Sequence, residues 1–427
     1  MNIPEIHKLF LSCNSVSTDT RKIAPNSMFF AIKGERFDAN TFASEALEKG
    51  ASFVILDNSD YKVDQRTIVV EDTLTALQQL AAYHRLYLGI PIVGLTGSNG
   101  KTTTKELINA VLSQKFKTGA TVGNLNNHIG VPLTLLSFTG ETELGIVEMG
   151  ANHQKEIEFL CGIAQPDLGY ITNFGKAHLE GFGGTEGVIK GKSELYDYLR
   201  ANAKKAIVNV EDDIQNDKTA DFDRYTFGVN TKADVVIDDV SANPFVITGY
   251  KGETIHSHLI GLYNSNNINA AICIGQYFGI SATAIREAIE GYVPANNRSQ
   301  IITKGTNEII LDAYNANPSS MAAAIANFVQ IEKSSKAMIL GDMFELGQES
   351  AQEHKQLVQS LEGRGIPTYF IGKDFFQNRI DNTNLHFYPD FDAFVASGII
   401  SGLIGKVLLI KGSRGMALER LLEYLPV

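Results

Sequence analysis

The segment VGLTGSNGKTTT, residues 93–104, has the residue types of a loop that binds phosphate. In the common pattern, G-x-x-x-x-G-K-[ST], backbone N–H groups surround the phosphate oxygens, the lysine reaches the β- and γ-phosphates, and the hydroxyl binds Mg²⁺. Gly100, Lys101 and Thr102 match the end of this pattern, but Leu95 stands where its first glycine is expected. The segment therefore indicates nucleotide chemistry with a loop that starts late. The competing interpretation is a glycine turn with an exposed lysine.

The residues on either side predict the elements that would position this loop. IPIVGLTG (90–97) is a short apolar run typical of a buried strand. KTTTKELINAVLSQKF (101–116) has helical periodicity, with one apolar face made by Leu107, Ile108, Val111 and Leu112. The glycines thus lie at a strand-to-helix turn, where free N–H groups and the helix dipole hold anions. This position favours the nucleotide interpretation over a chance GKT.

Two further polar side chains follow predicted strands. Glu148 ends LGIVEMGA (144–151), and His178 lies in the glycine-rich TNFGKAHLEGFGG (172–184). Carboxylates at the carboxyl ends of parallel strands face the ligand crevice, and oxygen ligands suit Mg²⁺, so we predict that Glu148 binds a metal and that His178 is functional. A solvated glutamate and a surface histidine are the alternatives. The next segment, TEGVIKGKSELYDYL (185–199), has a helical pattern, and its lysines by themselves indicate a solvated helix face.

Apolar strands and helical segments alternate in three regions, which predicts an α/β fold of three domains. Residues 1–88 form a small N-terminal α/β domain, residues 89–296 a central P-loop-type ATPase domain with a parallel sheet, and residues 297–427 a C-terminal Rossmann-like domain. The strands behind this division are SMFFAIKG, ASFVILD and RTIVV; IPIVGLTG, LGIVEMGA, DLGYITNF and KAIVNV; and EIILDAY, KAMILGD, IPTYFIG and KVLLIKG.

Composition limits the class of protein. The chain has 427 residues, of which 44% are hydrophobic and 20% charged, so it can bury several cores. A formal net charge of −11 argues against general binding to nucleic acid or to an acidic membrane. Cys13, Cys161 and Cys273 form no C-x-x-C pair, MNIPEIHKLF does not have the pattern of a signal peptide, and ASGIISGLIGKVLLI is too short to span a bilayer. We therefore expect a cytoplasmic protein with reduced thiols, no nucleic-acid partner and no membrane insertion.

Several motifs occur in one order along nearly the whole chain: DTRKIAPNSMFFAIKGERFDANTF, TGSNGKTT, GNLNNHIGVP, VEMGANHQKEI, HLEGFG, KGKSE, DAYNANPSSM, GDMFELG and KGSR. Together they resemble the Mur ligases, ATP-dependent enzymes that form amide bonds in peptidoglycan synthesis. That family uses the shortened loop T-G-x-x-G-K-T, which accounts for the late start of the loop here. GNLNN and DAYNANP favour the branch of the family that adds a dipeptide.

The resemblance implies roles for individual residues. An ATP site would contain Gly97, Ser98, Asn99, Gly100, Lys101, Thr102 and Thr103, with Asn267 at adenine, Arg298 at phosphate and Asp312 at ribose. Two Mg²⁺ ions would be held by Thr102, Glu148, His178 and Lys192, with Lys192 carbamylated by CO₂; Lys101 joins Glu148, His178 and Lys192 as the catalytic set. UDP-substrate contacts would come from Arg21, Lys33, Arg36, Asn40, Asn126 and Asn127, and dipeptide contacts from Asn315, Asn317, Lys411, Ser413 and Arg414. A carbamate would replace a repelled amine by an anionic ligand, and burial lowers lysine pKa toward the reactive neutral form.

The activity implied by the resemblance is the ATP-dependent joining of D-alanyl-D-alanine to UDP-N-acetylmuramoyl-tripeptide through an acyl phosphate. The N-terminal domain would bind the UDP-sugar, the C-terminal domain the dipeptide, and the enzyme would be a monomer. The alternatives are a sister Mur ligase or folylpolyglutamate-type ligase, and, from another class, a non-catalytic nucleotide-binding regulator. A regulator would keep the loop without needing Glu148, His178 and Lys192 together, and it would hydrolyse ATP without either peptide substrate.

Overall fold

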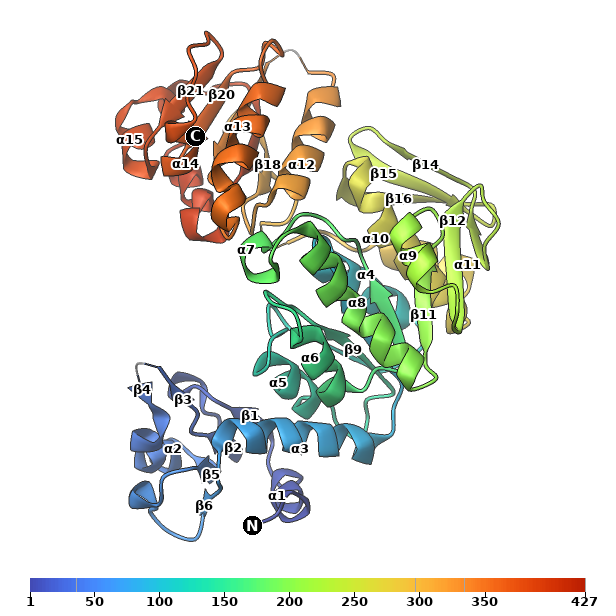
Figure 1. Cartoon of the computed structure of the whole chain (residues 1–427), viewed down its shortest axis with the longest axis vertical. Coiled ribbons are helices and arrows are strands. Elements are labelled where there is room, and N and C mark those ends of the chain that lie inside the picture. Colours follow the sequence, from blue (N-terminus) through green and yellow to red (C-terminus); the bar gives the residue numbers. More distant parts are fainter. Residues whose placement is uncertain (36, 296, 334, 427) are drawn as a thin grey trace.

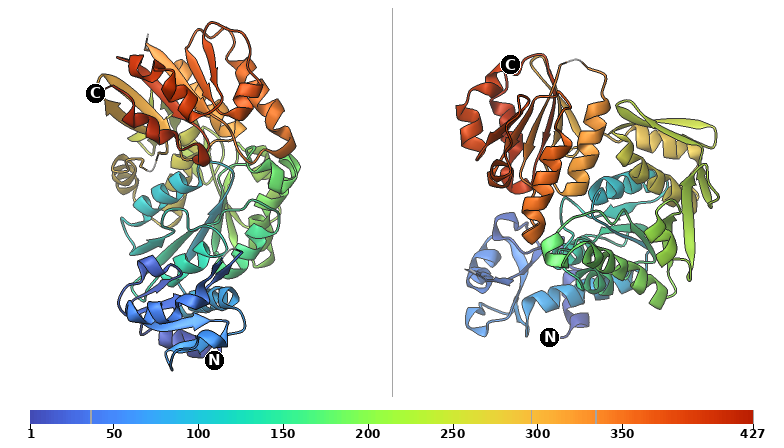
Figure 2. Two further views of the ribbon diagram at one scale, coloured as in Figure 1. Left: turned by 90° about the vertical axis from the view of Figure 1, so that its left-hand side faces the viewer. Right: turned by 45° about the horizontal axis from the view of Figure 1, so that its top comes forward.

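The computed structural model describes residues 1–35, 37–295, 297–333 and 335–426. Three α/β regions follow one another along the chain, from the blue N-terminal region at the bottom of Figure 1, through the green central region, to the orange and red C-terminal region at the top. A view turned by 90° shows the same order (Figure 2, left). Each region is built on its own largely parallel sheet, as the alternating sequence pattern predicts.

The N-terminal region is a four-stranded parallel sheet with the order β1-β2-β5-β6. Its strand β2, with the sequence SMFF, is buried along its whole length, as expected where a parallel sheet is covered on both faces. A short antiparallel pair, β3 and β4, lies outside this sheet. The bounds are α1 (Ile3–Phe10), β1 (Ser15–Ser17), β2 (Ser27–Phe30), β3 (Lys33–Gly34), β4 (Phe37–Asp38), α2 (Ala43–Glu48), β5 (Ala51–Leu56), β6 (Thr67–Val69) and α3 (Thr73–Leu88).

Helix α3 belongs to two regions at once. It begins after Asp72, whose side chain accepts a hydrogen bond from the Thr75 N–H, and it ends before Gly89. The helix packs against α1 and β2 of the N-terminal region and against α5 and α6 of the central region, beneath which it lies in Figure 1. Arg85 adds an ion pair with Asp167 of the central region, at 2.6 Å between Nη2 and Oδ2. The N-terminal and central regions therefore share one core.

A buried histidine pair fastens α1 to α3. His7 Nε2 lies 3.0 Å from His84 Nδ1, and His84 Nε2 lies 2.9 Å from the carbonyl oxygen of Phe138 in the central region. Because a carbonyl only accepts, His84 donates through Nε2 and accepts from His7 at Nδ1. Burial lowers the pKa of both imidazoles, and His84 lowers that of His7 further, so both side chains are neutral near pH 7.

The central region contains a seven-stranded sheet with the order β13-β12-β11-β10-β7-β9-β8, in which every neighbouring pair is parallel. Strand β7 lies between β10 and β9, with Thr96 opposite Ile171 and Leu95 opposite Glu148. This register brings the phosphate loop, Glu148 and the segment after β10 to one edge of the sheet. The strands are β7 (Ile92–Thr96), β8 (Thr118–Ala120), β9 (Leu144–Glu148), β10 (Leu168–Ile171), β11 (Lys205–Asn209), β12 (Arg224–Val229) and β13 (Val235–Ile237).

The helices of this region cover the sheet, and α4 buries the apolar face that the sequence predicts. They are α4 (Lys101–Leu112), α5 (Gly130–Leu136), α6 (Glu156–Ala164), α7 (Leu179–Phe182), α8 (Thr185–Ala201), α9 (Asp213–Lys218), α10 (Ser265–Tyr277) and α11 (Ala282–Glu290). The central region also contains a separate antiparallel sheet that the sequence pattern does not predict, drawn in yellow-green in Figure 1. Its strands are β14 (Asp239–Ala242), β15 (Phe245–Tyr250) and β16 (Glu253–Ile260). This sheet packs against α11 and shares the apolar cluster on that side of the central sheet.

The C-terminal region has a six-stranded sheet with the order β17-β18-β22-β19-β20-β21, parallel except for β17. The strands are β17 (Gln300–Lys304), β18 (Asn307–Asp312), β19 (Lys336–Gly341), β20 (Thr368–Ile371), β21 (Leu385–Tyr388) and β22 (Val407–Lys411). The helices are α12 (Pro318–Gln330), α13 (Ser350–Ser360), α14 (Lys373–Gln377) and α15 (Phe391–Ala396). Short 3₁₀ turns, η1 to η8, connect elements in all three regions. Among the residues described above, no helix is both long and apolar enough to cross a bilayer.

Candidate functional site

A cavity of about 860 Å³ lies at the carboxyl edge of the central sheet, where that edge faces the C-terminal region. The sequence-predicted residues that line it are Ser98, Asn99, Gly100, Lys101, Thr102, Thr103, Asn126, Asn127, Glu148, His178, Asn267, Arg298, Asp312, Asn315, Asn317, Lys411, Ser413 and Arg414. Segments far apart in the sequence therefore meet at one place. Gly97 and Lys192, which the sequence analysis also named, lie just outside the cavity wall.

The conformation of the phosphate loop explains why glycine occupies two of its positions. Gly97 has φ +139°, and a Cβ there would lie 2.0 Å from the Thr172 hydroxyl oxygen. Gly100 has φ +79°, and a Cβ there would lie 2.6 Å from Asn267 Oδ1. Both positions combine a backbone conformation that favours glycine with a close approach by a neighbour. The loop conformation therefore requires glycine at both positions, although the first glycine stands later in the sequence than in the common pattern.

Lys101 is the first residue of α4, so the loop lies at the amino end of that helix. Its ammonium donates to the Gly97 and Ser98 carbonyl oxygens, at 2.8 and 3.2 Å, and curls over the loop. Burial lowers the pKa of Lys101, Glu148 opposes that effect, and Arg298 adds to it. Positive charge, free N–H groups and the helix dipole thus converge where a phosphate would bind.

Glu148 is 1% exposed at the end of β9. Its Oε1 accepts hydrogen bonds from Asn126 Nδ2 at 2.8 Å and from the Thr102 hydroxyl at 3.3 Å. Within the described structure, its Oε2 is buried and has no hydrogen-bond partner. A buried carboxylate oxygen without a donor is costly unless a cation or a polar ligand group satisfies it, so Glu148 is suited to bind a cation.

His178 follows β10 in a left-handed conformation, φ 52°, immediately before α7. Its Nδ1 lies 2.5 Å from Glu345 Oε2 of the C-terminal region, although the two groups are not aligned as a hydrogen bond. Glu345 is thus a contact of His178 that the sequence analysis did not name. In this arrangement the histidine faces both the cavity and the C-terminal region.

Lys192 is fully buried in α8, whereas Lys190 of the same helix is exposed. The Lys192 ammonium lies 4.8 Å from the centre of the Phe182 ring and donates to the Ala151 carbonyl oxygen at 3.1 Å. Burial lowers its pKa far below the ordinary value, and the nearby Lys101 lowers it further. The solvated helix face that the local pattern indicates is therefore wrong for Lys192. Ala151 lines the cavity, so Ala151 separates the Lys192 amine from the cavity.

The three residues assigned to nucleotide contacts all line the cavity but differ in their present partners. Asn267 accepts from the Thr104 hydroxyl at 3.0 Å and donates to Asn264 Oδ1 at 2.8 Å. The Arg298 guanidinium stacks on the Tyr314 ring at 3.6 Å from its centre. Asp312 forms a 2.6 Å ion pair with Lys411.

The residues assigned to the dipeptide line the cavity, but several of their polar groups bond within the C-terminal region. Lys411 is 2% exposed and pairs with Asp312. Ser413 donates to the Ala316 carbonyl and accepts from the Phe344 N–H. Asn315 Oδ1 accepts from the next N–H in the chain, that of Ala316. Arg414 is largely exposed and pairs with Glu419. The Asn317 amide donates to Asn99 Oδ1 of the phosphate loop.

The N-terminal residues assigned to the UDP-sugar do not line the cavity. Arg21 and Lys33 are exposed and pair with Asp19 and Asp38, and Arg36 lies outside the described residues. Asn40 is fully buried. Its amide accepts from two backbone N–H groups, those of residues 57 and 58, and donates to the carboxylates of residues 38 and 57. In this structure Asn40 has a structural role, since every polar atom of its side chain is bonded within the protein, and its predicted contact with the UDP-sugar stays a prediction.

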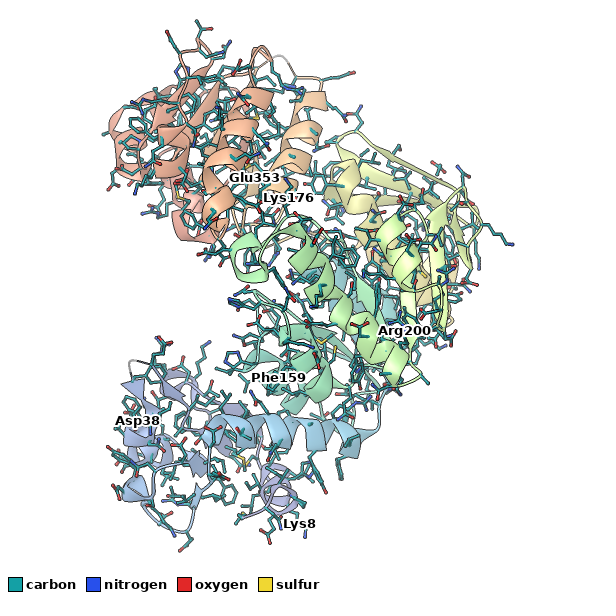
Figure 3. The ribbon with its side chains drawn as sticks, in the orientation of Figure 1. Lys8, Asp38, Phe159, Lys176, Arg200 and Glu353 are labelled. Atoms are coloured by element: carbon teal, nitrogen blue, oxygen red, sulfur yellow. The ribbon has the colours of Figure 1, made fainter. Side chains whose placement is uncertain are left out.

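Among the cavity residues that sequence reasoning did not name, four are instructive. Tyr314 and Glu345 lie inside DAYNANP and GDMFELG, so the motifs themselves carried the signal. Asn173 follows β10 and holds the phosphate loop, donating to the Asn99 carbonyl and accepting from its N–H. Phe159 of α6 (Figure 3) is 47% exposed at the cavity, and nothing in its local pattern distinguishes it from a surface residue of an amphipathic helix.

Three family models match successive parts of the chain. Residues 12–85 match the Mur ligase family, catalytic domain; residues 95–275 match the Mur ligase middle domain; and residues 297–414 match the Mur ligase, glutamate ligase domain. These matches cover all three sheets of Figure 1 that contain mainly parallel strands.

Related proteins span almost the same length. The chain is 36% identical to the UDP-N-acetylmuramoyl-tripeptide–D-alanyl-D-alanine ligase of Bacillus subtilis, over 96% of this chain and 93% of that protein. It is 33% identical to the Escherichia coli enzyme of the same name, over 99% and 95%. A crystal structure of MurF from Acinetobacter baumannii superposes with a TM-score of 0.87 at 31% identity, covering 99% of this chain and 98% of that one. MurF from Thermotoga maritima, in complex with ADP, gives 0.84 at 27% identity and 97% coverage of each chain. This chain therefore belongs to the Mur ligase family.

Proposed function

We propose that this chain is an ATP-dependent ligase that joins D-alanyl-D-alanine to UDP-N-acetylmuramoyl-tripeptide. The observation that carries the proposal is the cavity where the phosphate loop and the free oxygen of Glu148 face the C-terminal region. The chain that builds this cavity is related over nearly its whole length to enzymes named for that reaction. The product is the UDP-linked pentapeptide.

The reaction has two steps. The terminal carboxylate of the tripeptide attacks the γ-phosphorus of ATP, which gives an acyl phosphate and ADP. The amine of D-alanyl-D-alanine then attacks the acyl carbon, expels phosphate and loses a proton. The first step brings two anions together, and the cations of Lys101 and Arg298 at the cavity offset that repulsion. The C-terminal region covers the cavity and limits the water that would hydrolyse the acyl phosphate.

Mg²⁺ fits this cavity beside Thr102 and Glu148. Mg²⁺ usually binds through one or two carboxylates together with substrate phosphates and water. The unpartnered Glu148 Oε2 and the adjacent Thr102 hydroxyl match that requirement. When bound, Mg²⁺ neutralises charge on the phosphate oxygens. His178, at the same cavity, is the candidate ligand for a second ion.

Lys192 is the proposed site of carbamylation. In that reaction the neutral amine nitrogen attacks the carbon of CO₂, a C–N bond forms, and a proton is lost to give an anionic carbamate. The burial of Lys192 favours the neutral amine, and its position behind Ala151 would bring the new oxygens to the cavity wall. The nearby cation of Lys101 favours an anion at this place.

Labelling with ¹³CO₂ tests this proposal directly. The wild-type enzyme should show a carbamate carbon signal by NMR, Lys192→Ala should lose both that signal and activity, and acetate or formate should restore part of the activity. Lys190→Ala is the matched control, because Lys190 is exposed on the same helix, and it should retain both. A fully active Lys192→Ala enzyme would contradict the role.

The three regions divide the substrates between them in this proposal. Residues 1–88 bind the UDP-sugar, with Arg21 and Lys33 as exposed cations; residues 89–296 bind ATP; and residues 297–427 receive the dipeptide. Asn126 and Asn127 of the central region line the cavity and are further proposed contacts of the UDP-substrate. We further propose that the enzyme acts as a monomer in the cytoplasm, and light scattering with all substrates present tests the first part.

A coupling assay tests the overall function. Purified protein, ATP, Mg²⁺, UDP-N-acetylmuramoyl-tripeptide and D-alanyl-D-alanine should give a product with the mass of the pentapeptide. Phosphate should be released only when both peptide substrates are present. Release of phosphate without them, and no new mass with them, would favour a nucleotide-binding regulator instead. A product formed with a single amino acid but not with the dipeptide would indicate a sister ligase.

A further inference from the structure

The phosphate loop is held from two sides by different regions of the chain. On the central side, Asn173 fixes the backbone of Asn99, accepting from its N–H at 3.1 Å and donating to its carbonyl oxygen at 3.0 Å. Thr172 donates to the same carbonyl at 2.6 Å. On the C-terminal side, Asn317 Nδ2 donates to Asn99 Oδ1 at 2.7 Å. One side chain of the C-terminal region therefore reaches the loop itself.

Both ends of the Asn317 side-chain amide have a protein partner in this arrangement. It is the N-cap of α12, and its Oδ1 accepts from the Ser320 N–H at 2.9 Å. The Ser320 hydroxyl completes the capping box by accepting from the Asn317 N–H. The oxygen of the amide is thus used by the helix and the nitrogen by Asn99, and the residue is 7% exposed. The dipeptide contact implied by the family resemblance would have to use the second N–H of this amide, and it stays a prediction.

Neighbouring contacts hold the same two surfaces together. The segment after Asn173 passes between the loop and α12: the Gly175 carbonyl accepts from the Ser98 hydroxyl at 2.6 Å, and the Lys176 N–H donates to the Ser319 hydroxyl at 2.8 Å. A Cβ on Gly175 would lie within 3.0 Å of both Asn99 Nδ2 and Ser319 Oγ. The end of α12 is therefore seated closely against the loop.

We infer that Asn317 is a positioning residue that ties the docked C-terminal region to the phosphate loop through Asn99. The inference rests on the proposed function, since it assumes that the loop binds the phosphates of ATP. If so, the C-terminal region, which is proposed to receive the amine substrate, also helps to hold the phosphate loop in its conformation. Phosphoryl transfer then depends on docking of that region, and Asn317 acts on the rate of the reaction and not on affinity for the dipeptide.

Asn317→Ser is the informative variant, because serine caps helices about as well as asparagine while its hydroxyl is too short to serve both Ser320 and Asn99. In the coupling assay with the full chain, its kcat should fall on the order of fivefold, the worth of one such hydrogen bond. The KM for D-alanyl-D-alanine should change by less than about twofold, because the energy of the lost bond is not given to the dipeptide. Ser320→Ala is the matched control: it weakens the same cap without touching Asn99, and its kcat should stay near wild type.

A double-mutant cycle completes the test. Asn99→Ala should lower kcat by a similar factor, and the double variant Asn99→Ala with Asn317→Ser should be no worse than the poorer single variant, because both remove one contact. Additive losses would overturn the inference. So would a tenfold rise in the dipeptide KM of Asn317→Ser with kcat retained, since that result marks a dipeptide contact. Lys101→Met distinguishes a failure of the proposed function from a failure of this inference. If Lys101→Met stays fully active, the loop does not bind the phosphates of ATP and the proposed function fails. If Lys101→Met is inactive and Asn317→Ser is unaffected, only the positioning role of Asn317 is refuted.

Discussion

The ion pair between Lys176 and Glu353 predicts unequal effects for its two partners. The pair joins the segment after β10 to α13, with 2.6 Å between Nζ and Oε1, and Figure 3 shows it at the junction of the central and C-terminal regions. The Lys176 side chain is 43% exposed, whereas that of Glu353 is 10% exposed. Removing the lysine therefore leaves a nearly buried carboxylate without its cation, and removing the carboxylate leaves a lysine that water can solvate.

The magnitudes follow from this difference in exposure. Lys176→Met should weaken docking of the C-terminal region by about 2 kcal/mol, roughly 30-fold in the docking equilibrium, because the stranded carboxylate pays the desolvation cost of a buried charged group. Glu353→Gln should cost only about 0.5 kcal/mol, roughly twofold, which is the value of a pair that is screened by solvent on one side. The double variant removes the stranded charge and should recover to about the level of Glu353→Gln.

Small-angle scattering and ligation rates measure the outcome. Lys176→Met should increase the radius of gyration of the unliganded protein and lower the rate of product formation, and Glu353→Gln should do little of either. Raising the salt concentration should reduce the small effect of Glu353→Gln more than the large effect of Lys176→Met, because exposed charges are screened first. The reasoning fails if Glu353→Gln is at least as harmful as Lys176→Met, or if the double variant is as poor as Lys176→Met alone.

Three other predictions follow from polar groups described above. Glu148→Gln should lower activity by about 100-fold or more through loss of an anionic ligand, and calorimetry should show weaker Mg²⁺-dependent binding of ADP. Because burial lowers the pKa of His7 and His84, the unfolded chain binds more protons than the folded one, so the stability of the contact between α1 and α3 is present above about pH 6.5 and is lost as pH falls. The protection factors of the α1 amides against hydrogen exchange, which correct for the intrinsic rate at each pH, should therefore fall between pH 7 and pH 5, and unchanged protection factors would contradict it. Asn40→Ala should destabilise the N-terminal region by about 2 kcal/mol, measured as a lower unfolding midpoint in urea, because it leaves buried partners unsatisfied.

The sequence predicts those parts of the fold that depend on local pattern. The apolar run before Gly97 and the apolar run that ends at Glu148 form the adjacent parallel strands β7 and β9. The segment with helical periodicity that begins at Lys101 forms α4, with the expected buried face. Parallel strands carry their functional groups at one edge, so a strand order alone is enough to bring such residues together. The three-stranded antiparallel sheet was not predicted because its strands follow one another without an intervening helix that would mark a crossover.

The local sequence pattern does not predict contacts between segments that are far apart in the sequence. Asn40 reads as an exposed polar residue of a loop, yet carboxylates and N–H groups from two other segments enclose it. The local pattern around Lys192 is that of a surface helix, and only the packing of α8 against Phe182 and Ala151 buries it. The contact of His178 with Glu345 joins loops that follow strands of two different sheets, and no spacing within either motif specifies it. In each case a partner remote in the sequence decides the environment of the side chain.

Helix α3 packs against both the N-terminal and the central region, and this has a mechanical consequence. If the molecule were pulled from its two ends in an optical trap, the C-terminal region would extend as a separate event. The remaining chain would not yield sheet by sheet, because tearing the N-terminal sheet away strips α3 from α5 and α6 and breaks the bond between Arg85 and Asp167. The force-extension record should therefore contain two rupture steps for three sheet-based regions, and the larger step would belong to a unit of two sheets that share one helix.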